Sequence, residues 1–225
     1  MGKLIAIEGL DGSGKETQSK LLYNDLLSQG KNVNLISFPN YSSRSSSLVQ
    51  MYLEGEFGDD PDAVSPYAAS TFFAVDRYAS YQKDWKEFFE KADSIVIANR
   101  YATSNAIHQL SKLPRDDWDE YLKWLYDLEF GKLAIPSPGL VLFLDVKPEI
   151  SLEHIKKRSE ETGRELDIHE KDYDYLVHCY KAACYACDKL GWVKIPCCND
   201  RGLLPIEEIH EKIEEKVTMF LDVAD

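Results

Sequence analysis

Residues 5–17 read Ile-Ala-Ile-Glu-Gly-Leu-Asp-Gly-Ser-Gly-Lys-Glu-Thr, and this stretch decides the fold. Its apolar start predicts a buried strand, its glycines a tight turn, and Lys15 the first turn of a helix. Glycines let successive N–H groups surround a phosphate at the positive end of that helix. The pattern is G-x-x-x-x-G-K-[ST], except that Glu16 stands where a Mg²⁺-binding hydroxyl is expected. Residues 9–17 therefore predict a nucleotide-phosphate site, the P-loop.

The composition limits the class of protein. With 225 residues, 44% of them hydrophobic, the chain can bury one substantial core, and we expect a single domain over residues 1–225. The formal net charge of −13 argues against a nucleic acid polymer or a membrane surface as the main partner. The sequence begins with a predicted strand, and no apolar run approaches the length of a membrane span, so we expect a cytoplasmic protein.

The cysteines occur late in the sequence, and their odd number favours reduced thiols over a disulfide framework. They are Cys179, Cys184, Cys187, Cys197 and Cys198. The spacing of the first three resembles part of an iron–sulfur pattern. However, Cys184 and Cys187 share an apolar helical stripe with Tyr180 and Ala183, so we expect packed thiols there instead of metal ligands.

Short apolar segments alternate with longer amphipathic segments along the chain. The segments expected to form strands are 4–8, 33–38, 94–98, 140–144 and 192–195. Those expected to form helices are 15–28, 65–89, 102–110, 118–130, 151–172 with a loop, the cysteine-bearing segment and 206–221. Uncharged strands separated by helices are typical of a parallel sheet covered on both faces. We therefore expect a three-layer α/β fold with a five-stranded parallel sheet flanked by helices.

Two predicted helices carry a recognisable apolar pattern. In the helix over 65–89 we expect Phe73, Tyr78 and Trp85 to be among the buried residues. In the closing helix Ile206, Ile209, Ile213, Val217 and Phe220 lie along one side at helical spacing.

Ligands of such a sheet gather beyond the carboxyl ends of its strands. Arg100 directly follows the third predicted strand, so we expect it at the same edge as Lys15, where it can contact an anion. Phe73 precedes Arg77 by four residues, and a ring beside a guanidinium can bind a planar base. The alternatives are a surface role for Arg100 and, for the pair, core packing with an arginine that reaches solvent.

These segments, taken in order, resemble the thymidylate kinase family over nearly the whole chain. The matching motifs are Ile7-Glu8-Gly9-Leu10-Asp11-Gly12-Ser13-Gly14-Lys15, Phe38-Pro39, Phe73-x-x-Asp76-Arg77, Asn99-Arg100-Tyr101-x-x-Ser104-x-x-x-x-Gln109, Leu144-Asp145-x-x-Pro148-Glu149 and Arg158…Gly163-Arg164-Glu165-x-Asp167-x-x-Glu170. The resemblance implies a P-loop kinase fold and transfer of the ATP γ-phosphoryl group to dTMP, giving dTDP and ADP in dTTP biosynthesis. It also implies Mg²⁺ as cofactor and a homodimer that packs through helices rather than across the active site.

The resemblance further implies roles for individual residues. The ATP-binding set is Gly9, Leu10, Asp11, Gly12, Ser13, Gly14, Lys15, Glu16 and Thr17. The dTMP-binding set is Asp11, Phe38, Pro39, Phe73, Arg77, Arg100, Tyr101, Ser104 and Gln109. Within it, Asp11 is expected to meet the sugar 3′-hydroxyl and Arg100 the acceptor phosphate. Phe73 is expected to stack on thymine while Arg77 bonds its edge.

Four cations are expected to support the transfer: Lys15, Arg100, Arg158 and Arg164. The last two fall in a lid at about residues 156–171. Gly12 is typical of the subgroup whose P-loop lacks an arginine and whose lid supplies that charge. A guanidinium closing over the transferred group stabilises its developing charge, and a closed lid excludes water. A charged surface helix is the alternative interpretation of the two lid arginines.

Three positions depart from the family pattern. Glu16 replaces a hydroxyl and Asn99 replaces the more usual aspartate, so the local charge is unchanged. We hypothesise that Glu16 supports Mg²⁺, directly or through water, while Asn99 is a neutral orienting partner. The alternative is that Glu16 only faces solvent near the helix N-terminus. Many relatives also carry an arginine where this chain has Asn40 and Tyr41, and Arg44 is a candidate replacement for contact with the monophosphate.

Other functions share some of these features. A deoxynucleoside kinase has the P-loop, an arginine near the third strand and a lid, but its acceptor is an uncharged hydroxyl. A nucleotide-dependent switch is disfavoured because no guanine-reading Asn-Lys-x-Asp sequence occurs. A non-catalytic nucleotide-binding module is supported only by Glu16 and Asn99.

Overall fold

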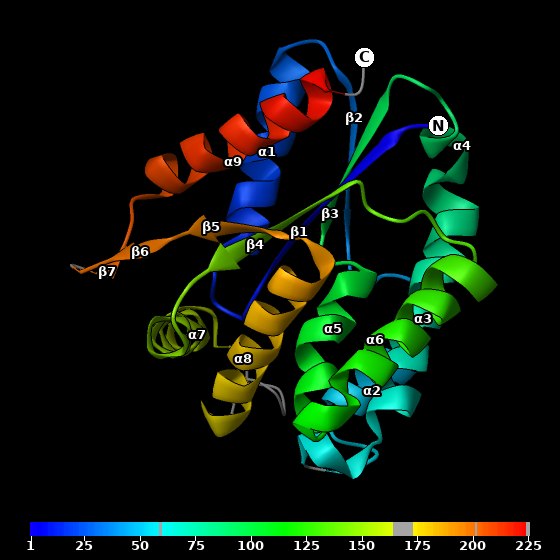
Figure 1. The fold of residues 1–225 in the computed structure, drawn as a ribbon, viewed down its shortest axis with the longest axis vertical. Helices are drawn as coiled ribbons and strands as arrows, with labels where there is room; N and C mark the ends of the chain where they lie inside the picture. The colour runs from blue at the N-terminus through cyan, green and yellow to red at the C-terminus, as the bar shows by residue number, and fades with distance from the viewer. Residues whose placement is uncertain (59, 164–172, 201, 224–225) are drawn as a thin grey trace.

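The computed structural model of the chain describes residues 1–58, 60–163, 173–200 and 202–223. A sheet of five parallel strands runs through its centre in the order β2-β3-β1-β4-β5 (Figure 1). The strands are β1 (Lys3–Gly9), β2 (Asn32–Ser37), β3 (Ser94–Asn99), β4 (Leu140–Asp145) and β5 (Val193–Pro196). The predicted α/β class and five-stranded parallel sheet are therefore confirmed.

Successive side chains of the central strand β1 point to opposite faces of the sheet. Leu4 and Ala6 belong to the core on one face, and Ile5 and Ile7 to the core on the other. Both faces are apolar, so helices must cover both. Helices α1 (Lys15–Ser28) and α9 (Ile206–Asp222) pack on the second face, while the first is covered by α3 (Pro66–Ser80), α5 (Asn105–His108), α6 (Trp118–Tyr126) and α8 (Tyr173–Leu190).

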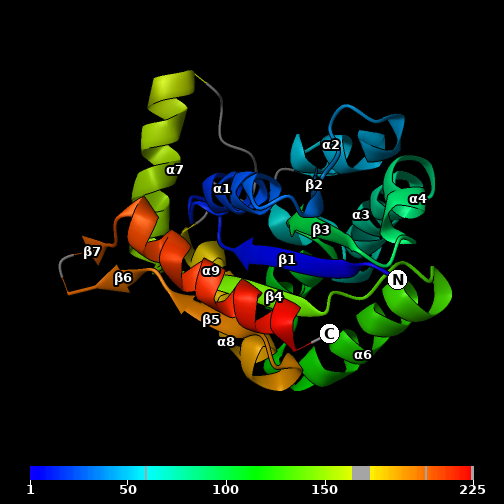
Figure 2. The same cartoon turned by 90° about the horizontal axis from the view of Figure 1, so that it is seen from above.

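The remaining elements are short or lie at the margin of the sheet. They are α2 (Ser47–Leu53), α4 (Lys86–Phe89), α7 (Pro148–Thr162) and the antiparallel pair β6 (Cys198–Asn199) and β7 (Gly202–Leu203). Helix α7 projects from the molecule beyond the start of α1 (Figure 2). Helix α2 and the β6–β7 pair were not predicted, because elements this short do not show a helical or strand period in the sequence. No helix in the described part of the chain is both long and apolar enough to cross a membrane.

Several predicted helices are less regular than expected. The helix over 65–89 contains a π-helical turn at Tyr81–Trp85, and the segment over 118–130 passes from α6 into another at Asp127–Lys132. Residues 102–110 form only one short α-helix between two 3₁₀ turns. One burial prediction was wrong, because Tyr78 is 40% exposed. Tyr78 follows Val75, which is 51% exposed, by three residues on α3, so the two share an exposed side of this helix. Ile206, the first residue of α9, is 48% exposed.

The cysteines are all free thiols, as expected from their number. Burial raises the pKa of Cys179, Cys187 and Cys197 to about 12. These thiols are therefore protonated at neutral pH and are poor nucleophiles, which fits a packing role.

Candidate active site

A cavity of about 360 Å³ lies at the carboxyl ends of β1, β2 and β3. Every residue predicted to bind dTMP lines it: Asp11, Phe38, Pro39, Phe73, Arg77, Arg100, Tyr101, Ser104 and Gln109. Glu16, Ser19, Asn99, Asn105 and His108 line it as well. The parallel sheet explains most of this convergence, because Asp11, Phe38-Pro39 and Arg100 follow strands that end at one edge, and helix α3 adds Phe73 and Arg77.

The P-loop forms the turn between β1 and α1, as predicted. Gly12 and Gly14 have φ values of +75° and +84°, a left-handed conformation that favours glycine. Lys15 is buried, and its Nζ donates to the backbone oxygen of Leu10 at 2.6 Å and lies 3.4 Å from Ser13 Oγ. The lysine therefore folds over the loop that is expected to hold phosphate.

Position 12 also needs a residue without a side chain, because α7 packs closely against it. A Cβ at this position would lie 2.5 Å from the backbone oxygen of Ser151 and 3.1 Å from Ile155. His154 of α7 also places Nδ1 3.1 Å from the Gly12 oxygen. A larger residue here would push α7 off the P-loop. The predicted lid begins in this helix, but the Arg158 side chain and all of Arg164 lie outside what the structure describes.

Arg100 follows β3 and has a φ of +65°, which is uncommon for a residue other than glycine. Its Nη2 pairs with Asp11 of the P-loop, and its Nη1 lies 2.9 Å from His108 Nε2 on α5. Burial alone would lower the pKa of Arg100, but the carboxylates of Asp11 and Glu8 raise it above its usual value. The guanidinium thus stays charged between the P-loop and the cavity.

His108 was not predicted as a site residue. Arginine can only donate hydrogen bonds, so the Nε2 that faces Arg100 must be an acceptor. The His108 ring is buried, at 7% exposed, so the surrounding side chains hold it in this orientation. Only the folded chain brings His108 to Arg100, because the two are eight residues apart and belong to different elements.

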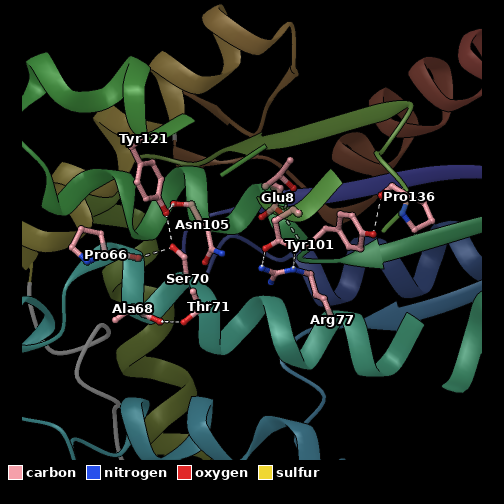
Figure 3. Close-up of polar contacts among 12 residues, drawn as sticks. Glu8, Pro66, Ala68, Ser70, Thr71, Arg77, Tyr101, Asn105, Tyr121 and Pro136 are labelled. Atoms are coloured by element: carbon pink, nitrogen blue, oxygen red, sulfur yellow. Dashed lines mark hydrogen bonds and ion pairs between the residues drawn. The ribbon is translucent and has the colours of Figure 1, made fainter. Parts of the chain in front are cut away.

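Glu8 organises the segment after Arg100. Its carboxylate is fully buried and accepts from the Tyr101 backbone N–H at 2.9 Å, Thr103 Oγ1 at 2.6 Å and Ser104 Oγ at 2.6 Å. Ser104 was predicted to bind dTMP, and its hydroxyl donates to Glu8. The Tyr101 ring is buried, and its hydroxyl donates to the Pro136 oxygen at 2.9 Å, away from Arg77 (Figure 3).

The inner part of the cavity holds polar groups that suit the edge of a planar ligand. Gln109 is fully buried, and neither its Nε2 nor its Oε1 has a hydrogen-bond partner among the described residues. The same is true of Asn105 Nδ2. Buried amides without partners are costly, so these groups are expected to bond a ligand or water. Phe73, partly buried, adds a ring to the same cavity.

Arg77 pairs with Glu129, a residue that the sequence analysis did not single out. Arg77 Nε lies 3.2 Å from Glu129 Oε2, and Nη2 contacts Oε1, with 2% and 0% of the two side chains exposed. Glu129 lies in the π-helical turn after α6. The sequence did give one indication of this partner, because a carboxylate between Leu128 and Phe130 is expected to pair with a buried cation.

The loop after β2 is fixed from α3. Asp76 is 1% exposed and accepts from the Asn40 backbone N–H at 2.8 Å and from Ser45 Oγ at 2.6 Å. This loop places Tyr41 in the cavity lining, whereas Arg44 is exposed and is not a lining residue. A contact between Arg44 and a monophosphate stays a prediction.

Two oxygen-bearing residues fit a hard divalent cation. Asn99 Nδ2 donates to Ser37 Oγ at 3.0 Å, while its buried Oδ1 has no partner among the described residues. Glu16 lines the same cavity, is 70% exposed and pairs with Lys20 one turn along α1 at 2.6 Å. An amide oxygen and a carboxylate are donors that Mg²⁺ accepts.

Comparisons with known proteins converge on one family. A sequence profile described as thymidylate kinase matches residues 7–213. The thymidylate kinase of Mycobacterium tuberculosis is 32% identical over 171 residues, which cover 75% of this chain and 78% of that protein. The thymidylate kinase of Caenorhabditis elegans is 32% identical over 67% of this chain and 66% of its own length. The solved thymidylate kinase of Candida albicans has the same fold, with a TM-score of 0.68, 21% identity, and coverage of 97% of this chain and 92% of its own.

Proposed function

The chain belongs to the thymidylate kinase family, and we propose that it transfers the γ-phosphoryl group of ATP to dTMP, giving dTDP and ADP. One observation supports this most strongly. A single cavity has Arg100 and Asp11 beside the P-loop and the unpartnered amide of Gln109 among its buried lining groups. It thus offers a cation for a phosphate and hydrogen-bonding groups for a base. We also propose a cytoplasmic location, which the free thiols support.

In this proposal the acceptor base stacks on Phe73, and its edge bonds Arg77 and Gln109. Glu129 engages Nε and Nη2 of Arg77, so Nη1 remains for a base oxygen. Arg100 binds the acceptor phosphate and exchanges part of its contact with Asp11 for it. The Asp11 carboxylate then accepts from the sugar 3′-hydroxyl.

On the donor side, the backbone N–H groups over residues 9–17 hold the ATP phosphates, and Lys15 moves from the Leu10 oxygen to the outer phosphates. Glu16 and Asn99 would hold Mg²⁺, which when bound neutralises charge on the ATP phosphates. The lid arginines Arg158 and Arg164 are proposed to cover the transferred group.

The function is tested by incubating the chain with ATP and Mg²⁺ together with dTMP, thymidine or no acceptor, and separating the nucleotides chromatographically. We expect dTDP and ADP in equal amounts, with dTMP as acceptor only. Formation of dTMP from thymidine would identify a deoxynucleoside kinase instead. Absence of ADP with every acceptor would identify a non-catalytic module.

The role of Glu16 is tested through its exchange with Asn99. Glu16→Ser is expected to raise the Mg²⁺ concentration needed for half-maximal rate, and adding Asn99→Asp is expected to restore part of the loss, because it returns one carboxylate to the site. Lys20→Met is the control, since it removes the ion-pair partner of Glu16 but keeps the carboxylate. Additive losses in the Glu16/Asn99 double variant would contradict the exchange.

His108 is proposed to position Arg100 for the phosphate. His108→Phe keeps a ring but removes the acceptor, so we expect the KM for dTMP to rise about tenfold, since a hydrogen bond to a charged group contributes about 1.5–3 kcal/mol. The kcat is expected to change less. His178→Phe, at an exposed histidine outside the cavity, is the control. A dTMP KM within about twofold of wild type would rule out the positioning role.

We further propose a homodimer that packs through α3. Val75 is 51% and Tyr78 40% exposed, and the two are three residues apart on one face of this helix. Val75→Asp is expected to shift the chain toward monomer in sedimentation equilibrium. Leu27→Asp is the matched control, because Leu27 is also 51% exposed but lies on α1. Equal mass for Val75→Asp and wild type would argue against this interface.

A further inference from the structure

A group of metal-ligating side chains lies between α1 and α9, outside the cavity of the candidate active site. It comprises Asp25 on α1 and, one turn apart on α9, His210 and Glu214. One ligand atom from each residue can be chosen so that all lie within 4.8 Å of one another. None of the three lines the cavity at the carboxyl ends of the strands, and the proposed kinase reaction does not use them.

The hydrogen bond to Gln18 shows which nitrogen of His210 carries a hydrogen, because it involves Nδ1. Gln18 is 2% exposed, and its Nε2 donates to the Ile206 backbone oxygen at 2.9 Å, so its Oε1 is the atom that faces His210 Nδ1 at 3.1 Å. Since Oε1 can only accept, Nδ1 carries a hydrogen and donates it. Hydrogen bonding of this kind commonly fixes the orientation of a metal-binding histidine.

The other nitrogen therefore needs a cation. His210 Nε2 contacts a carboxylate oxygen of Asp25, and the His210 side chain is only 11% exposed. A bare lone pair on Nε2 would face the lone pairs of that carboxylate, which is repulsive. A cation that binds both groups removes this repulsion, and a metal ion can do so when the Asp25 carboxylate moves back from Nε2. The Glu214 carboxylate adds a second negative charge, so a proton leaves the group with one net negative charge, whereas a divalent ion neutralises both carboxylates.

We propose that Asp25, His210 and Glu214 form a site for a divalent transition-metal ion, with Zn²⁺ as the ion that fits best. One imidazole nitrogen and two carboxylate oxygens are all donors that bind Zn²⁺, and they leave a fourth position for water. Mg²⁺ and Ca²⁺ prefer sites made entirely of oxygen. Asp25 is 41% exposed, so its side chain is free to move back from Nε2 and admit the ion.

The site would join the two helices that cover one face of the sheet. Helix α1 begins at Lys15 of the P-loop, and α9 packs along it. An ion that binds only the folded chain stabilises it by mass action. The inference therefore concerns stability and metal affinity, and it is independent of the proposed phosphoryl transfer.

The test uses the whole chain after removal of metals with a chelator. Zn²⁺ at about 100 times its dissociation constant is expected to raise the Tm by about 5–10 °C. The His210→Gln, Asp25→Asn and Glu214→Gln variants are expected to weaken Zn²⁺ binding in calorimetry by at least about tenfold. Gln18→Ala, which removes the hydrogen bond to Nδ1, is expected to weaken it by about 10–100-fold. Glu211→Gln, an exposed acid on the same helix, is the control and is expected to bind Zn²⁺ as wild type does.

Co²⁺ distinguishes this site from the thiols. Co²⁺ bound by His210 and the two carboxylates is expected to give visible absorption without a thiolate-to-cobalt charge-transfer band, and His210→Gln is expected to abolish it. A Zn²⁺ affinity equal in wild type and all three ligand variants would overturn the proposal. So would cobalt binding through thiolate alone.

Discussion

Arg100→Ala is expected to lower kcat/KM for dTMP by about 10²–10³-fold, the largest loss we expect from a single substitution. Removing one partner of a buried charge pair costs about 2–5 kcal/mol, and each 1.4 kcal/mol is a factor of ten. The substitution removes the cation proposed for the acceptor phosphate. It also removes the contact between Arg100 and Asp11 while the Asp11 carboxylate stays in the cavity lining. Initial rates over a range of dTMP concentrations measure the effect.

Two comparisons isolate the role of the charge. Arg100→Lys keeps a cation but loses the planar fork that reaches Asp11 and His108 together, so we expect an intermediate loss. Binding of thymidine, which has no phosphate, is expected to be weakened far less than binding of dTMP. Equal weakening of both ligands would mean that Arg100 supports the cavity rather than the phosphate.

Glu129→Gln is expected to lower the free energy of unfolding by about 3–5 kcal/mol, because it leaves the buried Arg77 guanidinium without a counter-charge. The KM for dTMP is expected to rise in parallel, since Arg77 is no longer fixed for the base. Urea denaturation measures the stability, and initial rates measure the KM.

A double variant separates folding from binding. Replacing a buried ion pair with apolar residues of similar volume is often neutral or stabilising. Arg77→Met with Glu129→Leu is therefore expected to recover most of the stability but none of the dTMP affinity. Recovery of both would show that Arg77 does not bind the base.

Much of the fold could be predicted, because its signals are local. The apolar segments of β1, β3 and β4 and the P-loop glycines carry their conformations in their own residue types. Tyr78 could not be assigned correctly, because helical periodicity does not say which side of α3 lacks a covering element. The β6–β7 pair is too short to show any period.

The parts of the candidate site that lie in recognisable motifs could be predicted from the sequence. All residues proposed to bind dTMP line one cavity, and those that follow strand ends, such as Asp11 and Arg100, could be placed there from the sequence. The residues that hold them were harder to find. Glu129 lies 52 positions from Arg77, and His108 faces Arg100 from a separate helix, so only tertiary structure reveals these contacts. Glu16 was noticed as a departure, but its pairing with Lys20 required the geometry of α1.

The most direct test of the central claim is a crystal structure of the chain with dTMP bound. We predict that thymine lies against Phe73 with its edge bonded to Arg77 and Gln109, and that the phosphate contacts Arg100. A nucleotide whose phosphate lies away from Arg100, or whose base binds outside the cavity that Gln109 lines, would contradict the account.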